Sequence, residues 1–279
     1  MSDIKLNVEG LNVHFVNGHR HTHAVRDVSF TLGREKLAIV GESGSGKSTV
    51  GRSLLKLHPP SARLCAKAMR FDGIDLLTAS ENVMRKVRGQ RISMVMQDPK
   101  YSLNPVVKVG EQIAEAFLAH HKASRREARE RVLEMLAKVH IRDPQRVYNL
   151  YPHEVSGGMG QRIMIAMMVI TRPEVIIADE PTSALDVSVR QQVLGVLEEL
   201  VEQQQMGLIF VSHDLNLVRN YCDRVLVMYA GRVVESLAAC DLHHAEHPYT
   251  RGLLAALPSM GNRRERLPVL QRDPLWLTC

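Results

Sequence analysis

The chain has 279 residues and a net charge of +6, with 45% apolar and 24% charged residues. This length and balance predict one large globular domain, or a core with a smaller insertion. Aromatic residues make up only 4% of the chain, which argues against a nucleic-acid surface built on base stacking. The mild positive charge suits an anionic ligand or a membrane surface and selects neither.

The apolar residues are not arranged for membrane insertion. Residues 1–5 contain no apolar signal segment, and the densest apolar run, 163–170, is far shorter than the roughly 20 residues that span a bilayer. We therefore expect a soluble chain, for which any membrane role needs a partner. The cysteines lie far apart and predict reduced thiols in a cytosolic protein. They are Cys65, Cys222, Cys240 and Cys279.

The first third of the chain predicts strands followed by a loop and a helix. Apolar and polar residues alternate over 6–32 around Asn17-Gly18, which is a strong hairpin signal. A short apolar strand over 36–40 leads into a glycine-rich loop, and residues 49–57 predict the helix after it.

The remainder predicts an α/β core that is interrupted by helices. Continuous apolar runs at 92–96, 175–178 and 208–211 suit strands buried on both faces, as in a parallel sheet. Helical spacing marks 109–138 and 187–205, and two more strands are expected at 225–228 and 232–235. We predict a core of residues 1–97 and 161–240, an inserted helical subdomain over 98–160, and a C-terminal extension over 241–279.

Residues 41–48 read Gly-Glu-Ser-Gly-Ser-Gly-Lys-Ser and match the full P-loop pattern. Glycines let backbone N–H groups surround phosphate oxygens, and the N terminus of the next helix adds its dipole. A Gly/Ser turn that merely precedes a lysine is the alternative, and the strand before and helix after argue against it. Lys47 is expected to neutralise the β and γ oxygens of a nucleoside triphosphate, and Ser48 to offer its hydroxyl to Mg²⁺. The predicted nucleotide-binding residues here are Gly41, Ser43, Gly44, Ser45, Gly46, Lys47, Ser48 and Thr49.

Two carboxylates, Asp179 and Glu180, follow the apolar strand at 175–178. In P-loop enzymes a carboxylate at the tip of such a strand holds Mg²⁺, so we expect this role for Asp179. Glu180 is the candidate general base that polarises an attacking water. A solvated acidic turn is the alternative, and it is the weaker reading beside a complete P-loop.

Together these motifs resemble an ATP-binding subunit of an ABC transporter over about residues 5–240. The resemblance implies an ABC ATPase fold, that is, a P-loop core with an N-terminal antiparallel β layer and an inserted α-helical subdomain. It also implies ATP hydrolysis with Mg²⁺. The residues that carry it are the P-loop, Gln97, Ser156-Gly157-Gly158, Asp179-Glu180, Ser183-Ala184-Leu185-Asp186 and His213.

The resemblance assigns roles to three residues outside the loop and the acidic strand end. Gln97 is expected to touch Mg²⁺ and the attacking water and to report nucleotide state to the helical insertion. His213 is expected to contact the γ-phosphate, and Phe15 to stack on adenine. Each has a structural alternative, namely a polar strand-end residue, a structural histidine and a core aromatic.

The resemblance also predicts that two chains share each nucleotide. Ser156, Gly157 and Gly158 resemble the signature segment, which would donate to the γ-phosphate of a nucleotide held by a second ATPase subunit. A glycine-rich helix cap is the alternative. Asp186 resembles the residue that couples the two sites, although it also suits an ordinary helix N-cap. Gly160 departs from the family pattern and costs up to roughly 1 kcal/mol relative to Ala at a helix start.

Local motifs resemble the importer subgroup for oligopeptides, dipeptides and nickel. They are residues 96–99 and 102–105 and the His-Pro-Tyr-Thr segment at 247–250, with Leu-Pro-Val-Leu at 267–270 also in keeping. We expect peptide uptake through two permease subunits and an extracytoplasmic binding protein, with a related ATPase chain as heterodimer partner, at the cytoplasmic side of the inner membrane. Nickel or metal-chelate import, and an accessory subunit of a soluble phosphonate-cleaving complex, are the alternatives.

Three features near the ends of the chain carry weaker signals. The four cysteines do not form the iron–sulfur set that some members carry, so no cluster is expected. The histidines at 19–23 suit a solvated hairpin tip better than a metal site. The Arg-rich run at 263–266 suits a solvated turn better than a lipid contact. The extension is expected to dock on a partner or to lie over the chain's own core.

Overall fold

The structure is a computed structural model that describes residues 4–18, 20–257, 273 and 276. The chain divides into two compact units. Unit 1 comprises Met1–Thr78 and Ile209–Cys279, and unit 2 comprises Ala79–Leu208. The expected runs 263–266 and 267–270 lie outside the described residues.

Unit 1 begins with the predicted hairpin. Strands β1 (Leu6–Asn17) and β2 (Arg20–Leu32) pair antiparallel, with Leu6 opposite Leu32 at the open end. Leu6, Val8, Leu11 and Val13 of β1 are fully buried or nearly so, whereas Phe15 is half-buried. Three strands too short for a periodicity signal complete this sheet: β4 (Ala62–Cys65) and β5 (Ala68–Phe71) pair with β1, and β6 (Ile74–Asp75) pairs with β5. The predicted antiparallel β layer is therefore confirmed and larger than expected.

A second set of strands in unit 1 positions the glycine-rich loop. Strand β3 (Lys36–Val40) runs parallel to β10 (Arg224–Tyr229), which turns back antiparallel into β11 (Arg232–Ala238). Strand β9 (Gly207–Ser212) lies on the other side of β3 and leads towards helix α9 (Leu215–Tyr221). Helix α1 (Lys47–Leu54) begins two residues earlier than predicted and ends three earlier, because left-handed Gly46 starts it and left-handed Lys56 follows its end.

The described part of the C-terminal extension packs on unit 1. A 3-10 helix, Ala239–His244, follows β11, and the backbone N–H of Ala239 donates to the carbonyl of Asp223 at 2.9 Å. Helix α10 (Pro248–Ala255) then contains the fully buried side chain of Tyr249. Residues 239–257 therefore agree with the alternative in which the extension lies over the chain's own core.

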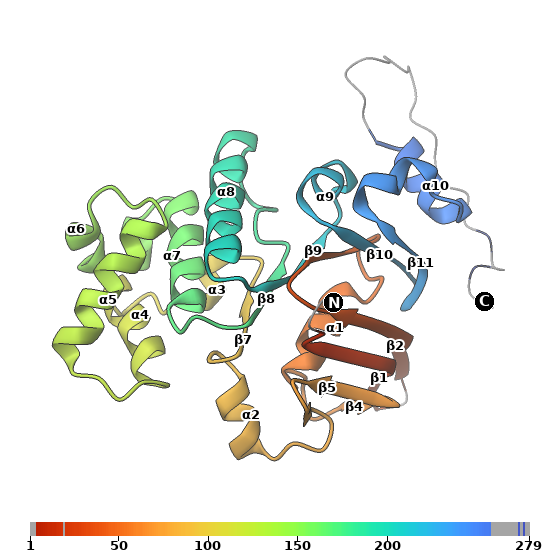
Figure 1. Cartoon of the computed structure of the whole chain (residues 1–279), viewed down its shortest axis with the longest axis horizontal. Helices are drawn as coiled ribbons and strands as arrows, with labels where there is room; N and C mark the ends of the chain where they lie inside the picture. Colours follow the sequence, from red (N-terminus) through yellow and green to blue (C-terminus); the bar gives the residue numbers. More distant parts are fainter. Residues whose placement is uncertain (1–3, 19, 258–272, 274–275, 277–279) are drawn as a thin grey trace. The chain divides into compact units, whose positions relative to one another are not determined.

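Unit 2 holds most of the helices, and Figure 1 shows α4 to α7 gathered into one group. Helices α4 (Val109–Leu118) and α5 (Arg125–Lys138) confirm the predicted helical stretch, and they pack with α6 (Pro144–Tyr148) and α7 (Gly157–Val169). Strands β7 (Ile92–Val95) and β8 (Val175–Asp179) pair in parallel, and α8 (Val187–Gln203) packs against α7. Short helices α2 (Glu81–Val87) and α3 (Pro99–Ser102) and a 3-10 turn at Pro152–Glu154 were not predicted.

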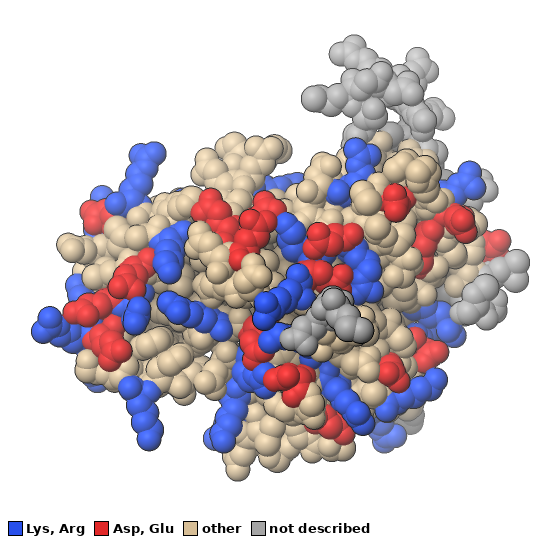
Figure 2. Space-filling model, viewed as in Figure 1, with Lys and Arg blue, Asp and Glu red and all other residues tan. Residues whose placement is uncertain are grey.

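The subdomain boundaries at 98 and 160 stay a prediction, because the helices belong to the same compact unit as β7, β8 and α8. Among the described residues, none of the helices combines the length and hydrophobicity that crossing a membrane requires. On the face shown in Figure 2, acidic and basic side chains of the described residues are interspersed.

Candidate functional site

The glycine-rich loop of unit 1 folds its lysine back over its own backbone. Lys47 is 5% exposed, and its Nζ donates to the carbonyl oxygens of Gly41 and Glu42, each at 2.8 Å. Helix α1 starts at this lysine, and its N-cap, Gly46, makes no side-chain cap. The N-cap thus supplies no side-chain acceptor to the first N–H groups of the helix, and a helix N terminus of this kind can bind phosphate oxygens.

Two glycines are required by how closely the loop approaches neighbouring backbone. A Cβ on Gly41 would lie 2.1 Å from the carbonyl oxygen of Met228, and a Cβ on Gly46 would lie 2.5 Å from that of Ala24. Both residues also have φ in the left-handed range, at +149° and +101°. The loop is therefore wedged between β2 and the end of β10, and no L side chain fits at either position.

Ser45 lies in the same loop and is hydrogen-bonded to the turn after β10. It is 4% exposed, and its carbonyl oxygen accepts from the N–H of Gly231 at 3.0 Å. Its hydroxyl is buried with no hydrogen-bond partner in the described part of the chain. The loop is thus held by backbone contacts, which leaves Ser43 and Gly44 exposed at its tip.

Two further sequence candidates lie in unit 1. Phe15 lies in β1, is half-buried, and meets the ring of His58 edge-on with centroids 5.7 Å apart. Burial lowers the pKa of His58, the partner of this aromatic. His213 is exposed and directly follows β9. Their nucleotide contacts stay predictions.

In the histidine-rich segment of the hairpin, His23 makes local side-chain contacts. The His23 ring stacks on His14 with centroids 3.9 Å apart, and its Nε2 lies 3.0 Å from the side-chain oxygen of Asn12. Within the described ranges, no three His, Cys, Asp or Glu side chains gather as a metal-binding group.

In unit 2, a hydrogen-bond network joins the residue after β7 to the end of β8. Gln97 Nε2 donates to Glu180 Oε2 at 3.3 Å and to Ser183 Oγ at 3.2 Å. Ser183 Oγ also donates to the carbonyl oxygen of Glu180 at 3.2 Å. Glu180 has φ +47°, a conformation that costs a non-glycine residue energy and that concentrates at functional sites. Asp179, at the tip of β8, is 4% exposed.

This network brings together Gln97 and Glu180, both chosen from the sequence, and adds Ser183. Sequence reasoning placed Ser183 in a family motif without giving it a role. The signal was its spacing, because a serine three residues after a strand-end glutamate can reach back to that residue's carbonyl. Its hydroxyl therefore holds the strained turn that aims the Glu180 carboxylate.

The Ser-Gly-Gly segment forms the predicted helix start. Ser156 caps α7 by accepting from the N–H of Met159 at 3.4 Å. A Cβ on Gly158 would lie 2.4 Å from Cγ1 of Val189 on α8, whereas a Cβ on Gly157 would meet only Leu185 at 3.8 Å. Gly158 thus allows the close approach of α7 to α8, whereas a Cβ on Gly157 would fit without a clash.

Gly160 lines a small hollow in unit 2. The hollow has a volume of about 230 Å³ and lies between the segment after Gln97, the start of α7 and the turn after β8. Gln161 also lines it, is 1% exposed, and has a buried Nε2 with no partner among the residues described. A Cβ on Gly160 would lie 3.6 Å from Pro99, an ordinary contact.

Asp186 is the N-cap of α8. Its Oδ1 accepts from the backbone N–H groups of Ser188 and Val189, each at 3.1 Å. The hydrogen bond from the Val189 backbone is the main cause that holds the pKa of Asp186 below its usual value, and Ser188 adds to it. The N-cap reading of this residue is confirmed, and its coupling role stays a prediction.

The loop after Gln97 is fastened to α4. The Gln112 side chain accepts from the N–H of Asn104 at 2.8 Å and donates to the carbonyl oxygens of Asn104 at 2.9 Å and Val107 at 2.8 Å. Gln112 is 7% exposed, so these bonds are shielded from water. The subgroup motif at 102–105 thus has a structural explanation, since it ties the loop after Gln97 to the helical group.

The P-loop of unit 1 and the carboxylates that end a buried strand in unit 2 define a P-loop nucleoside triphosphatase. Residues 25–183 match the family model described as ABC transporter. The chain belongs to the ABC transporter family as an ATP-binding, ATP-hydrolysing subunit, which confirms the resemblance and the fold class that its motifs predict.

Similar proteins share most of the chain's length. A probable peptide ABC transporter ATP-binding protein of Sinorhizobium fredii is 47% identical over 98% of this chain and 85% of its own length. A putative peptide import ATP-binding protein of Brucella abortus is 45% identical over 95% and 80%. The glutathione import ATP-binding protein GsiA of Escherichia coli O157:H7 is 47% identical over 92% of this chain, which matches 42% of that longer protein.

Solved structures agree on the fold. The dimeric ATP-binding cassette MJ0796, in a post-hydrolysis state bound to ADP and Pi, has a TM-score of 0.73 and 26% identity and covers 84% of this chain and 98% of its own. The cbiO1 subunit from Clostridium perfringens, part of the cbiONQ transporter complex, has a TM-score of 0.71 and 29% identity and covers 87% and 91%.

Proposed function

We propose that this chain hydrolyses ATP to drive peptide uptake through separate membrane permeases. The observation that carries the proposal is the network of Gln97, Glu180 and Ser183, which aims a carboxylate from the end of β8 in a family whose members hydrolyse ATP. The named relatives in Sinorhizobium and Brucella are peptide transport subunits, and GsiA serves glutathione, itself a small peptide.

The P-loop residues are proposed to bind the triphosphate. Backbone N–H groups at the start of α1 and the ammonium of Lys47 would neutralise the β- and γ-phosphate oxygens. The oxygens of Ser48, Asp179 and Gln97 suit Mg²⁺, which prefers hard oxygen ligands and would offset phosphate charge. Phe15 and His213 are proposed to contact adenine and the γ-phosphate.

Hydrolysis is proposed to use Glu180 as the general base. A water oxygen attacks the γ-phosphorus, the bond from that phosphorus to the β–γ bridging oxygen breaks, and the water proton passes to the Glu180 carboxylate. The products are ADP and inorganic phosphate. Gln97 would orient the water, and its hydrogen bond to Oε2 fixes where the accepting carboxylate lies.

A second ATPase subunit is proposed to complete each site. Ser156, Gly157 and Gly158 lie at the N terminus of α7, where N–H groups and the helix dipole favour an anion. We propose that they bind the γ-phosphate of a nucleotide held by the partner subunit, and that Asp186 couples the two sites. The partner is proposed to be a related but distinct chain, and the complex to include two permeases and a binding protein at the inner membrane.

The proposal is tested by reconstitution with candidate permease subunits from the same organism. We expect ATP-dependent uptake of labelled dipeptide or glutathione into proteoliposomes, and its loss in Lys47→Ala with uptake retained in the exposed control Lys122→Ala. Uptake of nickel in place of peptides would contradict the peptide assignment. Co-purification with a soluble enzyme complex and without permeases would contradict transport.

A further inference from the structure

The His-Pro-Tyr-Thr segment of the extension contacts the nucleotide-binding loop within unit 1. The backbone N–H of Glu42 in the loop donates to the hydroxyl oxygen of Tyr249 at 3.0 Å. These residues lie 207 positions apart in the sequence. Tyr249 is fully buried and Glu42 is half-buried, so the bond lies partly inside the protein and its length depends on where α10 lies.

The same loop residue also orients the phosphate-binding lysine. While the N–H of Glu42 is held by Tyr249, its carbonyl oxygen accepts from Nζ of Lys47 at 2.8 Å. A chain of hydrogen bonds thus runs from the tyrosine hydroxyl through one residue of the loop to the lysine ammonium. A shift of the Glu42 backbone would move the lysine with it.

Contacts from the extension and from the end of β10 hold Tyr249 in place. Its ring packs on Tyr229 at the end of β10, with centroids 4.6 Å apart, and on Trp276 at 6.0 Å. His247 caps α10 by accepting at Nδ1 from the N–H of Tyr249 at 3.1 Å. A Glu235 carboxylate oxygen accepts from the N–H groups of Glu246 at 2.7 Å and His247 at 3.3 Å, which fixes the approach to the helix.

We propose that Tyr249 is a positioning residue for Lys47, through which the C-terminal extension sets the affinity of the P-loop for ATP. This rests on the proposed nucleotide role of the loop. Tyr249 does not touch substrate in this scheme. It fixes the Gly41–Glu42 peptide group, whose carbonyl oxygen, that of Gly41, accepts from Nζ of Lys47 at 2.8 Å. The bond from Gly231 to Ser45 fixes the loop from a second side.

The test is Tyr249→Phe, which removes the hydroxyl and keeps the ring. We expect the Kd and KM for ATP to rise about 3- to 10-fold, the effect of one hydrogen bond, with kcat at saturating ATP nearly unchanged and the Tm of the ligand-free chain only slightly lowered. Tyr229→Phe is the matched control, because its ring lies in the same cluster and its hydroxyl makes no hydrogen bond within the described structure. We expect wild-type values from it.

Three results would overturn the proposal. They are an unchanged Kd in Tyr249→Phe, an equal rise in Tyr229→Phe, and a fall in Tm with no change in Kd, which indicates a purely structural hydroxyl. Calorimetric ATP binding by the wild-type chain separates this proposal from the proposed function. If the wild type binds ATP but drives no uptake, the transport role fails while the tyrosine test still stands.

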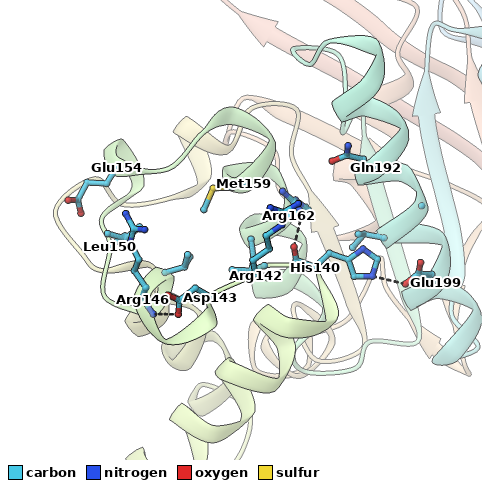
Figure 3. Close-up of a pocket in the computed structure, with 14 residues that line it drawn as sticks. His140, Arg142, Asp143, Arg146, Leu150, Glu154, Met159, Arg162, Gln192 and Glu199 are labelled. Carbon is cyan, nitrogen blue, oxygen red and sulfur yellow. Dashed lines mark hydrogen bonds and ion pairs between the residues drawn. The ribbon is translucent and has the colours of Figure 1, made fainter.

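A different observation, in unit 2, carries a second proposal. A hollow of about 790 Å³ lies between the loop after α5, the helix α7 and the helix α8. Figure 3 shows Arg142, Arg146 and Arg162 around it, and its floor includes the buried side chains of Ile141 and Val196. Its volume falls in the range of small-molecule sites, about 300–1,000 Å³.

Three carboxylates line the hollow beside the three arginines, and each of them has a local partner. Asp143 accepts from the backbone N–H of Arg146 at 3.1 Å, and Glu154 from that of Tyr151 at 2.8 Å. Glu199 lies 3.2 Å from His140 Nε2. The guanidinium groups of Arg142 and Arg146 make no hydrogen bond or ion pair to the described residues.

Arg162 is the least exposed of the three arginines. Its guanidinium donates to the carbonyl oxygens of His140 at 2.9 Å and Gly158 at 3.3 Å. Burial, and next the charge of Arg142, lower its pKa. Since Arg162 lies in α7, the hollow adjoins the helix that starts with the Ser-Gly-Gly segment.

We propose that this hollow binds a small anionic molecule with a phosphate or carboxylate group and an apolar body. Guanidinium groups match such anions with paired hydrogen bonds, and the aliphatic floor suits a short alkyl chain. The site is separate from the P-loop, since all of its lining residues belong to unit 2.

The test uses hexyl phosphate and inorganic phosphate as probes in Lys47→Ala, so that the P-loop does not compete. We expect hexyl phosphate to bind more tightly than inorganic phosphate, and Arg142→Ala with Arg146→Ala to weaken it about 10-fold or more. The control is Arg126→Ala, whose side chain is 90% exposed and pairs with Glu130 on α5. Equal binding of the two probes, or binding that survives the double substitution, would overturn the proposal.

Discussion

Gln97 and Glu180 are joined side chain to side chain, with Nε2 of the amide 3.3 Å from Oε2 of the carboxylate. They follow two neighbouring parallel strands, β7 and β8, which explains how residues 83 positions apart meet. The same amide reaches Ser183, so one side chain contacts both the carboxylate and the turn that presents it. A change at Gln97 therefore acts directly on the candidate general base.

Replacing Glu180 with Gln removes the proton acceptor and keeps the size of the side chain. We expect the ATPase rate to fall at least about 100-fold while ATP still binds, since general-base catalysis contributes roughly that much or more. The protein should accumulate in an ATP-bound closed dimer, detected by size-exclusion chromatography with ATP. Glu202→Gln, on the exposed face of α8, is the control. Wild-type turnover in Glu180→Gln would exclude this residue as the base.

Replacing Gln97 with Ala removes two hydrogen bonds of the network, those to Glu180 and Ser183. We expect kcat to fall about 10- to 100-fold, the range for a hydrogen bond to a charged group, with little change in the Kd for ATP. Ser183→Ala loses the bond to the Glu180 carbonyl and should give a smaller fall in the same direction. If Gln97→Ala raises the Kd and leaves kcat unchanged, the side chain serves binding instead of positioning.

Replacing Gly158 with Ala places a methyl group against Val189. The new Cβ would lie 2.4 Å from Val189 Cγ1, so α7 and α8 must separate. We therefore expect the free energy of unfolding to fall by about 1–3 kcal/mol. Urea denaturation measures this, and Gly157→Ala, whose Cβ meets only Leu185, is the matched control. Val189→Ala should recover part of the loss, and full additivity of the two changes would contradict the contact.

Replacing Gly160 with Ala should stabilise the fold, in contrast to the same change at Gly158. The added Cβ would lie 3.6 Å from Pro99 in ordinary contact, and Ala favours a helix over Gly by up to about 1 kcal/mol. We expect a higher Tm in a thermal denaturation scan. A lower Tm would mean that the hollow beside Gly160 does not accept even one methyl group.

Asp186 should make stability depend on pH at the acidic end. Its folded-state pKa lies below the ordinary value of 3.8, so its stabilisation is fully present above that pH and is lost as pH falls through the folded pKa. Asp186→Asn keeps an N-cap acceptor without the charge. We expect wild type to be the more stable at pH 7 and the difference in urea midpoint to shrink towards pH 3. A constant difference would contradict this.

The local sequence was sufficient for several of the elements and for the phosphate loop. Alternation around Asn17-Gly18 predicted β1 and β2, and the P-loop pattern predicted the β3–α1 junction, because turn chemistry and side-chain periodicity act over a few residues. It did not reveal β4 to β6 or α10. These elements are only two to eight residues long, and their place depends on what they pack against.

The sequence by itself determined that this chain is an ABC-type ATPase, since the motifs state which chemical groups are present and in what order. Only the tertiary structure decided which groups meet. The bonds from Gln97 to Glu180 and from Glu42 to Tyr249 join residues 83 and 207 positions apart. Such contacts depend on strand neighbours and on the direction in which a buried side chain points, and neither is encoded in any single stretch of sequence.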